Sequence, residues 1–206
     1  MKKISRLFAL MLLSACLSTS FTACVDSEDD EPSDNQETSG GLSAQEKKVI
    51  DLCNEARADG SAFAEKYLSD LKGSTNSYEK SLLEDLAKVK DVAPLVANEQ
   101  LCKAARAHAN DIGPKGLVQH NSSDGTATFT RVRQYYNGGA MGENIQFGPS
   151  DALSIVRQLL IDNGTESLGH RKNILNPTYI RIGVAIGKHS KYGSMCVQDF
   201  SDAAGD

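Results

Sequence analysis

The 206-residue sequence lacks any apolar run long enough to cross a membrane as a helix. Its most apolar stretch, residues 7–13, is far shorter than the roughly 20 residues that a spanning helix needs. This stretch follows the basic residues Lys2, Lys3 and Arg6, and that order is typical of a secretory signal peptide. We therefore expect residues 1–23 to be a signal peptide and the mature protein to have no spanning helix.

The sequence also has no surplus of positive charge, with 22 Lys and Arg residues against 27 Asp and Glu residues. Seven acidic residues lie at 25–40, a stretch with no basic residue, and three basic residues lie in the signal peptide. The remaining 20 acidic and 19 basic residues nearly balance, which argues against a phosphate-binding surface and a nucleic-acid partner. Because residues 25–40 have almost nothing to bury, we expect 24–41 to be a solvated tether.

Two cysteines near the end of the signal peptide follow small residues and resemble bacterial lipoprotein cleavage sites. Cleavage before Cys24 leaves a signal within the usual length of about 15–30 residues, whereas cleavage before Cys16 leaves a very short one. The sequence therefore favours lipidation of Cys24, and release by a conventional signal peptidase is the alternative. The acidic stretch that follows resembles the export signals of some Gram-negative lipoproteins. We predict that the lipid anchor makes the membrane a partner of this protein, and that the protein is an outer-membrane lipoprotein of the cell envelope. Display on the cell surface is consistent with the acidic signal.

The rest of the chain shows no internal repeat and no alternation of strands with helices. Apolar residues at helical spacing predict a helix capped by Ser43 and interrupted by Gly60, and further helices at 61–71, 78–89, 99–112 and 129–136 and after Ser150. Strand character is confined to 180–186 and 195–200, on either side of a Tyr-Gly turn. Short strands after a run of helices favour an α+β layered domain over residues 42–206.

Four segments carry a family signature when they occur in this order. They are Leu-Val-Gln-His at 117–120 with Ser-Asp-Gly at 123–125, Met-Gly-Glu-Asn-Ile at 141–145, Ser-Leu-Gly-His-Arg-Lys-Asn-Ile-Leu at 167–175 and Ile-Gly-Val-Ala at 182–185. The set resembles the CAP superfamily, which comprises the cysteine-rich secretory, antigen 5 and plant pathogenesis-related proteins, and most closely its bacterial members. The resemblance implies an α-β-α sandwich with a small antiparallel sheet between helical layers.

The resemblance also implies a cleft lined by His120, Glu143 and His170. All three residues lie in polar or glycine-flanked segments, which we read as turns that present the side chains to solvent. Two neutral imidazoles form part of a shell for a divalent metal, most plausibly zinc, with His120 and His170 as ligands and water completing the coordination. Glu143 is the candidate catalytic residue, and the sequence leaves open whether it acts as a metal ligand or as a base.

The absence of tryptophan matters for the second acidic residue of the cleft. In many members of the family this residue lies beside a tryptophan on the helix before the Gly-His segment, and no residue here matches it securely. Asp162 and Glu166 are the candidates, although Asp-Asn-Gly at 162–164 is also a good turn sequence, and we favour the turn.

The remaining histidines and cysteines have simpler interpretations. His108 falls on the apolar side of a helix and is expected to be a core residue, and His189 is expected to be exposed in the hairpin turn. Cys53, Cys102 and Cys196 occupy positions that read as core, and their odd number leaves at least one free thiol.

Three functions fit these observations. The first is an extracytoplasmic binding module that holds a divalent metal and an unidentified small-molecule, lipid or protein ligand. The second is a metal-dependent hydrolase acting on a peptide or an envelope polymer. The third is a surface interaction module in which His120, Glu143 and His170 only stabilise the cleft. The fold alone does not choose among them.

Overall fold

The computed structural model describes residues 41–205, so the predicted signal peptide, Cys16, Cys24 and the acidic tether lie outside the described residues. The described helices and strands follow one another as α1 (Ala44–Ala58), α2 (Gly60–Tyr67), a 3₁₀ turn (Ser69–Leu71), α3 (Ser77–Leu86), β1 (Val96–Ala97), α4 (Glu99–Ile112), α5 (Thr128–Val132), β2 (Met141–Phe147), α6 (Ala152–Ile161), α7 (Gly169–Leu175), β3 (Arg181–His189) and β4 (Gly193–Ser201). None of the helices within 41–205 has the length and apolar character needed to cross a membrane.

The four strands form one sheet in the order β1-β3-β4-β2. β3 and β4 form the expected hairpin, and β2 pairs antiparallel with β4 from Met141 opposite Ser201 to Phe147 opposite Met195. The two-residue strand β1 pairs parallel with β3. The sheet is therefore mixed, whereas the sequence predicted an antiparallel sheet. β2 is an edge strand.

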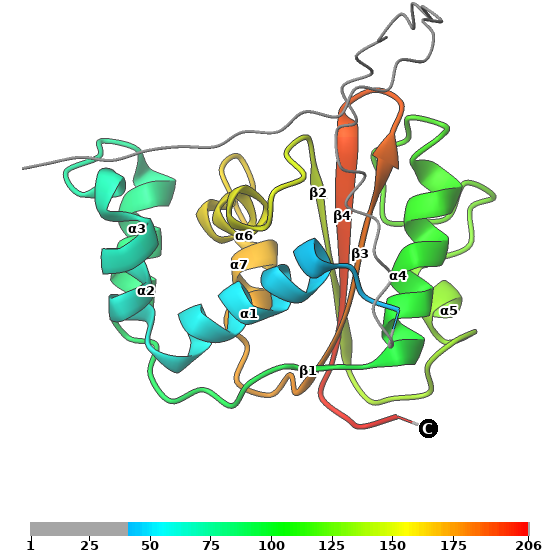
Figure 1. The fold of residues 1–206 in the computed structure, drawn as a ribbon, viewed down its shortest axis with the longest axis horizontal. Helices are drawn as coiled ribbons and strands as arrows, with labels where there is room; N and C mark the ends of the chain where they lie inside the picture. Colours follow the sequence, from blue (N-terminus) through cyan, green and yellow to red (C-terminus); the bar gives the residue numbers. More distant parts are fainter. Residues whose placement is uncertain (1–40, 206) are drawn as a thin grey trace, which may run out of the picture. The chain divides into compact units, whose positions relative to one another are not determined.

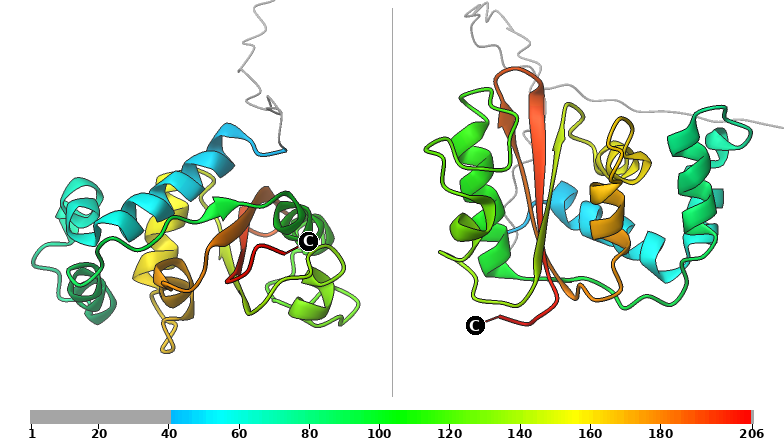
Figure 2. Two further views of the ribbon diagram at one scale, coloured as in Figure 1. Left: turned by 90° about the horizontal axis from the view of Figure 1, so that it is seen from below. Right: turned by 180° about the vertical axis from the view of Figure 1, so that it is seen from behind.

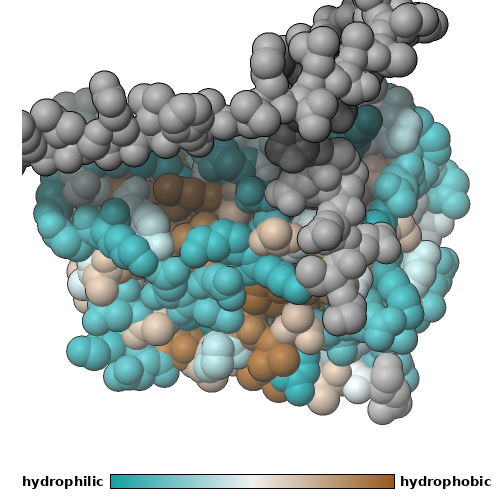
Figure 3. All heavy atoms as spheres, viewed as in Figure 1, coloured by the Kyte–Doolittle hydropathy of each residue, from teal (hydrophilic) through white to brown (hydrophobic). Residues whose placement is uncertain are grey.

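Helices cover both faces of this sheet, as the views in Figures 1 and 2 agree. α4 and α5 lie on one face, and α1, α6 and α7 lie on the other, with α2 and α3 beyond them (Figure 1). Apolar side chains fill both interfaces, such as Leu160 and Ile182 on one side and Ile112 and Val197 on the other. On the face drawn in Figure 3, hydrophilic residues cover most of the described surface. The α+β class and the α-β-α sandwich are confirmed.

Local signals explain several helix ends. Ser43 and Glu46 form the predicted capping box, in which each backbone N–H donates to the other residue's side chain. α6 is capped by Asp151 rather than by Ser150, because the Asp151 carboxylate accepts from the N–H of Ser154 at 2.9 Å. Gly60 begins α2 instead of interrupting a helix, and only glycine fits there, since a Cβ would lie 2.2 Å from the carbonyl oxygen of Leu86.

The segment at 141–147 corrects the prediction that strands are confined to the end of the chain. We read Glu143 as part of a turn, but it lies in the middle of β2 and is buried. The misreading has a physical reason. Strands are recognised by alternating apolar residues, whereas Glu143, Asn144 and Gln146 are polar and are buried through contacts with other side chains.

His189 corrects a second prediction. It is 2% exposed rather than solvent-exposed. Its Nε2 lies 3.0 Å from the carbonyl oxygen of Leu117, and its Nδ1 accepts from the backbone N–H groups of Lys191 and Tyr192. The ring therefore shapes the β3–β4 turn. His108, by contrast, is fully buried as predicted, with its Nε2 3.2 Å from the carbonyl oxygen of Gln119.

Candidate functional site

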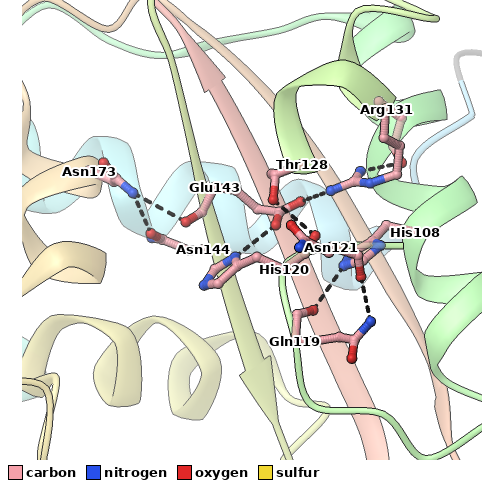
Figure 4. A network of polar contacts seen from close by, with 10 residues as sticks. His108, Gln119, His120, Asn121, Thr128, Arg131, Glu143, Asn144 and Asn173 are labelled. Atoms are coloured by element: carbon pink, nitrogen blue, oxygen red, sulfur yellow. Dashed lines mark hydrogen bonds and ion pairs between the residues drawn. The ribbon is translucent and has the colours of Figure 1, made fainter. Parts of the chain in front are cut away.

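Glu143 holds His120 in place from the edge strand β2. The Nδ1 of His120 lies 2.8 Å from Oε1 of Glu143, and Arg131 of α5 donates to Oε2 (Figure 4). The Glu143 side chain is only 2% exposed, whereas the His120 side chain is 52% exposed. Burial raises the pKa of the Glu143 carboxyl, but the hydrogen bond from His120 and the charge of Arg131 outweigh burial, so the pKa lies below its usual value. The carboxylate is therefore ionised and fully engaged with its neighbours.

Asp162 plays the corresponding part for His170. The Nδ1 of His170 lies 2.7 Å from Oδ1 of Asp162, and Oδ2 accepts from the backbone N–H groups of His170 at 2.9 Å and Arg171 at 3.2 Å. Asp162 ends α6 in the left-handed conformation, with φ of 56°. The residue is thus both the turn that we favoured and a carboxylate of the site. Glu166, the other candidate, is exposed.

Arg171 fixes the start of α7, and so the position of His170. It is buried, and its guanidinium donates to the carbonyl oxygens of Leu160 and Ile161 at 2.7 and 2.9 Å. It also donates to Asp85 of α3 at 3.0 Å. One arginine therefore ties α7 to α6 and α3, and His170 lies in the first turn of α7 rather than in the turn that we expected.

Asn144 connects the two histidines through β2. Its Nδ2 donates to the carbonyl oxygen of His170 at 3.1 Å, and its Oδ1 accepts from Nδ2 of Asn173 at 2.8 Å. Glu143 and Asn144 are successive strand residues, so their side chains point to opposite faces of the sheet. The Asn144 side chain therefore ties the backbone of His170, at the start of α7, to the face of β2 opposite the Glu143 side chain.

The free nitrogen of each imidazole is Nε2. Because a carboxylate accepts only from an N–H, each Nδ1 carries a proton, and in the neutral imidazole the lone pair is then on Nε2. In Figure 4 the second ring nitrogen of His120 points away from Glu143, toward the side of β2 on which α6 and α7 lie. This is the arrangement in which histidines bind metals, with the other ring nitrogen held by a carboxylate.

Each of the two histidines lines a cavity of its own. His170 lines a cavity of about 520 Å³, together with Asp162, Ile145 and Tyr192, and His120 lines a separate cavity of about 480 Å³ in the 119–125 loop. Among residues 41–205 no cluster of three or more His, Cys, Asp and Glu side chains has metal-binding geometry. The two imidazoles line different cavities, and each by itself offers one nitrogen donor to a metal or a ligand.

Two buried charged residues near the site were not recognised in the sequence. Asp199 of β4 lies opposite Glu143 in the sheet, and both of its carboxylate oxygens are buried without a hydrogen-bond partner among the described residues. Burial and the neighbouring charge of Glu143 raise the pKa of Asp199 well above its usual value. Arg131, on α5, supplies the positive charge beside them. Neither residue belongs to a recognisable motif; the sheet register reveals Asp199, and the contact with Glu143 reveals Arg131.

Comparisons with known proteins agree with this architecture. The family model of the cysteine-rich secretory protein (CAP) family matches residues 50–200. The chain is 30% identical over 174 residues to the uncharacterized protein YkwD of Bacillus subtilis. The matched region covers 81% of this chain and 65% of YkwD, so this chain spans less than two thirds of that relative.

Solved structures give weaker likenesses. An extracellular protein with an SCP domain from Bacillus anthracis shares 26% identity, with 54% of this chain and 34% of that chain covered and a TM-score of 0.45. The structure of NaASP2 with Zn²⁺ shares 14% identity, with 81% and 84% covered and a TM-score of 0.45. Together with the family match over most of the folded part, the α-β-α sandwich places this chain in the CAP family of cysteine-rich secretory proteins.

Proposed function

We propose that this protein is an extracytoplasmic binding module whose cleft holds a divalent metal, zinc, through Nε2 of His120 and of His170. The observation that carries the proposal is the matching support of the two rings. Each Nδ1 lies within 2.8 Å of a buried carboxylate, Glu143 for His120 and Asp162 for His170. Such support fixes the tautomer and makes the imidazole a better ligand.

In this proposal Glu143 positions a ligand and is not itself the base of a reaction. Its Oε1 bonds to His120 and its Oε2 bonds to Arg131, and the side chain is only 2% exposed, whereas a general base must reach the proton that it removes. Bound zinc would supply Lewis acidity and an open coordination position. The metal-dependent hydrolase with Glu143 as its catalytic residue stays a prediction from the sequence.

Zinc titration of the purified full chain by isothermal calorimetry tests the proposal. We expect one site, whose heat disappears in the variant that combines His120→Ala and His170→Ala. Asn163→Ala serves as the matched control, because Asn163 lines the same cavity as His170 without donating to either imidazole. Unchanged zinc binding in the double variant would refute the metal site.

The alternative is an interaction module whose cleft is purely structural. It is favoured by the finding that the described residues contain no cluster of three metal-binding side chains. Under this alternative the double histidine variant unfolds at a lower urea concentration but keeps its affinity for a partner. Under the metal proposal, chelation by EDTA lowers the urea concentration at which the wild-type chain unfolds, as the double variant does.

We further propose that Cys24 anchors the protein to the outer membrane. The support is the position of Cys24 after Phe-Thr-Ala, within the usual length of a signal peptide. Metabolic labelling with an alkyne palmitate tests it. Label should be lost in Cys24→Ser and retained in Cys16→Ser, and protease treatment of intact cells reports surface display. Loss of label only in Cys16→Ser would move the anchor to that residue.

A further inference from the structure

The cavity beside His170 lies at the open edge of the sheet. Ile145, Gln146 and Phe147, the last three residues of β2, all line it. Successive side chains of a strand point to opposite faces, so a cavity that touches all three must reach around the edge of β2. The backbone of this edge strand is therefore part of the cavity wall.

The sheet register tells which backbone groups face this cavity. The N–H of Gly148 donates to the carbonyl oxygen of Ser194, and the N–H of Asp202 donates to that of Ala140. Both pairs continue the β2–β4 register, so the even-numbered residues of β2 bond to β4. The N–H and C=O groups of the odd-numbered residues, Ile145 and Phe147 among them, point away from β4 to the open edge.

Helix α7 covers only the first half of this edge. Asn173 donates to the carbonyl oxygen of Glu143 at 3.3 Å, and a Cβ on Gly142 would lie 2.8 Å from Oδ1 of Asn173. In the second half, Gln146 donates to the carbonyl oxygen of Phe147 at 2.9 Å. The N–H and C=O of Ile145 and the N–H of Phe147 have no hydrogen-bond partner within residues 41–205. Backbone groups without partners at a strand edge are a template for another strand.

Side-chain amides continue this pattern of donors and acceptors. Gln146 donates to Oε1 of Gln158 at 3.0 Å as well as to Phe147, and these two bonds fix the orientation of its amide. Its Oε1 is buried without a partner in the described part of the chain. The Gln146 amide therefore occupies the carbonyl of Phe147 and leaves the N–H of Phe147 and both backbone groups of Ile145 as the edge groups that a peptide, with one donor and one acceptor per residue, can pair with.

The remaining walls select the character of the ligand. Val118 and Tyr192 line the cavity and are 55% and 44% exposed, so both present apolar surface to a ligand. Among the residues that the structure describes, no Lys or Arg lines the cavity, whereas Glu79 and Asp162 do. The walls thus offer apolar contacts without attracting an anion.

We propose that the open edge of β2 at 145–147 binds a neutral or basic peptide in an extended conformation, as an added strand that passes beside His170. Main-chain hydrogen bonds to Ile145 and Phe147 supply affinity, and contacts with Val118 and Tyr192 accept side chains of alternate peptide residues. The inference rests on the proposed function only in that the cleft takes a ligand, and the added strand does not require the metal.

Selection from a library of random octapeptides, acetylated and amidated at their ends, tests this inference. The full chain is used in EDTA, so that the metal plays no part. The selected peptides should carry no net negative charge, and binding should slow hydrogen–deuterium exchange in the segment at 143–149. Tyr192→Ala should weaken binding about tenfold, whereas Tyr135→Ala, which removes an exposed tyrosine outside this cavity, should not.

N-methylation of single peptide bonds provides the sharpest readout. A strand bonds to its neighbour through every second residue, so methylation at alternate positions should weaken binding about tenfold and methylation at the intervening positions should not. A lack of period-two dependence, or no enriched peptide, would overturn the inference. Peptide binding in a chain that fails to bind zinc would refute the metal site alone, and zinc binding without peptide binding would refute this inference alone.

Discussion

Asp162 accepts hydrogen bonds from both the ring and the backbone N–H of His170, at 2.7 and 2.9 Å. The same carboxylate also accepts from Arg171, so one buried side chain caps the start of α7 and orients the candidate ligand. The orientation of His170 is therefore coupled to the stability of the domain.

This coupling predicts the effect of Asp162→Gly. Glycine adopts the left-handed backbone of this position without strain, so the substitution removes mainly the carboxylate. We expect the free energy of unfolding to fall by about 1–3 kcal/mol, from the lost cap and the unpaired N–H groups. Urea unfolding measures it, with Asn163→Gly as the control at the neighbouring exposed position. Equal losses in the two variants would contradict the capping role.

Changing the carboxylates while keeping their shape should weaken the metal site. Glu143→Gln and Asp162→Asn retain a side-chain oxygen but remove the charge that supports each imidazole, and we expect each to lower zinc affinity about 10–100-fold. Glu79→Gln is the matched control, since Glu79 lines the cavity of His170 but bonds to Ser74 instead of a histidine. If zinc affinity is unaltered in both variants, the carboxylates do not act through the imidazoles.

Asp199 predicts a pH dependence of stability. Its pKa is raised by burial, so it keeps a proton in the folded state that it loses in the unfolded state above pH about 4. The stability that this bound proton contributes to the wild type is thus lost as the pH rises from about 4 toward the raised pKa. Asp199→Asn should be more stable than wild type at pH 8, with a difference that shrinks toward pH 4.

Urea unfolding across this pH range checks the prediction for Asp199. Asp51→Asn, at an exposed position on α1, should show no such trend. A stability difference between Asp199→Asn and wild type that is constant with pH would mean that Asp199 is ionised in the folded protein.

The cysteines should be unreactive in the folded protein. Cys53, Cys102 and Cys196 are buried, as the sequence predicted, and all three are free, whereas their odd number required only one free thiol. Burial raises the pKa of Cys53 to about 12 and that of Cys196 well above its usual value, which suppresses the reactive thiolate. At pH 8 iodoacetamide should leave Cys53 and Cys196 unmodified until urea is added, as mass spectrometry will report. Rapid labelling of the native chain would show that one of these cysteines is accessible.

The sequence predicted the fold class because its local signals agree with the tertiary structure. The capping box at Ser43 and the helix at 99–112 occur where predicted, and the β3–β4 hairpin follows from β-branched residues on either side of a glycine turn. β2 was missed because its buried residues Glu143 and Asn144 are polar, and their partners come from segments distant in the chain.

The site was predicted only in part for a similar reason. The resemblance named His120, Glu143 and His170, and the structure pairs Glu143 with His120 directly. Asp162 was underrated because a residue that ends a helix in the left-handed conformation reads as a turn, although its side chain is free to bond elsewhere. Asp199 enters through the strand register, which single-sequence patterns do not encode.

X-ray absorption at the zinc edge of the zinc-loaded full chain tests the central proposal most directly. The account predicts a site with two imidazole ligands at about 2.0–2.1 Å and oxygen atoms completing the coordination, and a loss of the imidazole scattering in the variant lacking His120 and His170. A shell of oxygen atoms alone, or one that contains sulfur, would contradict the account.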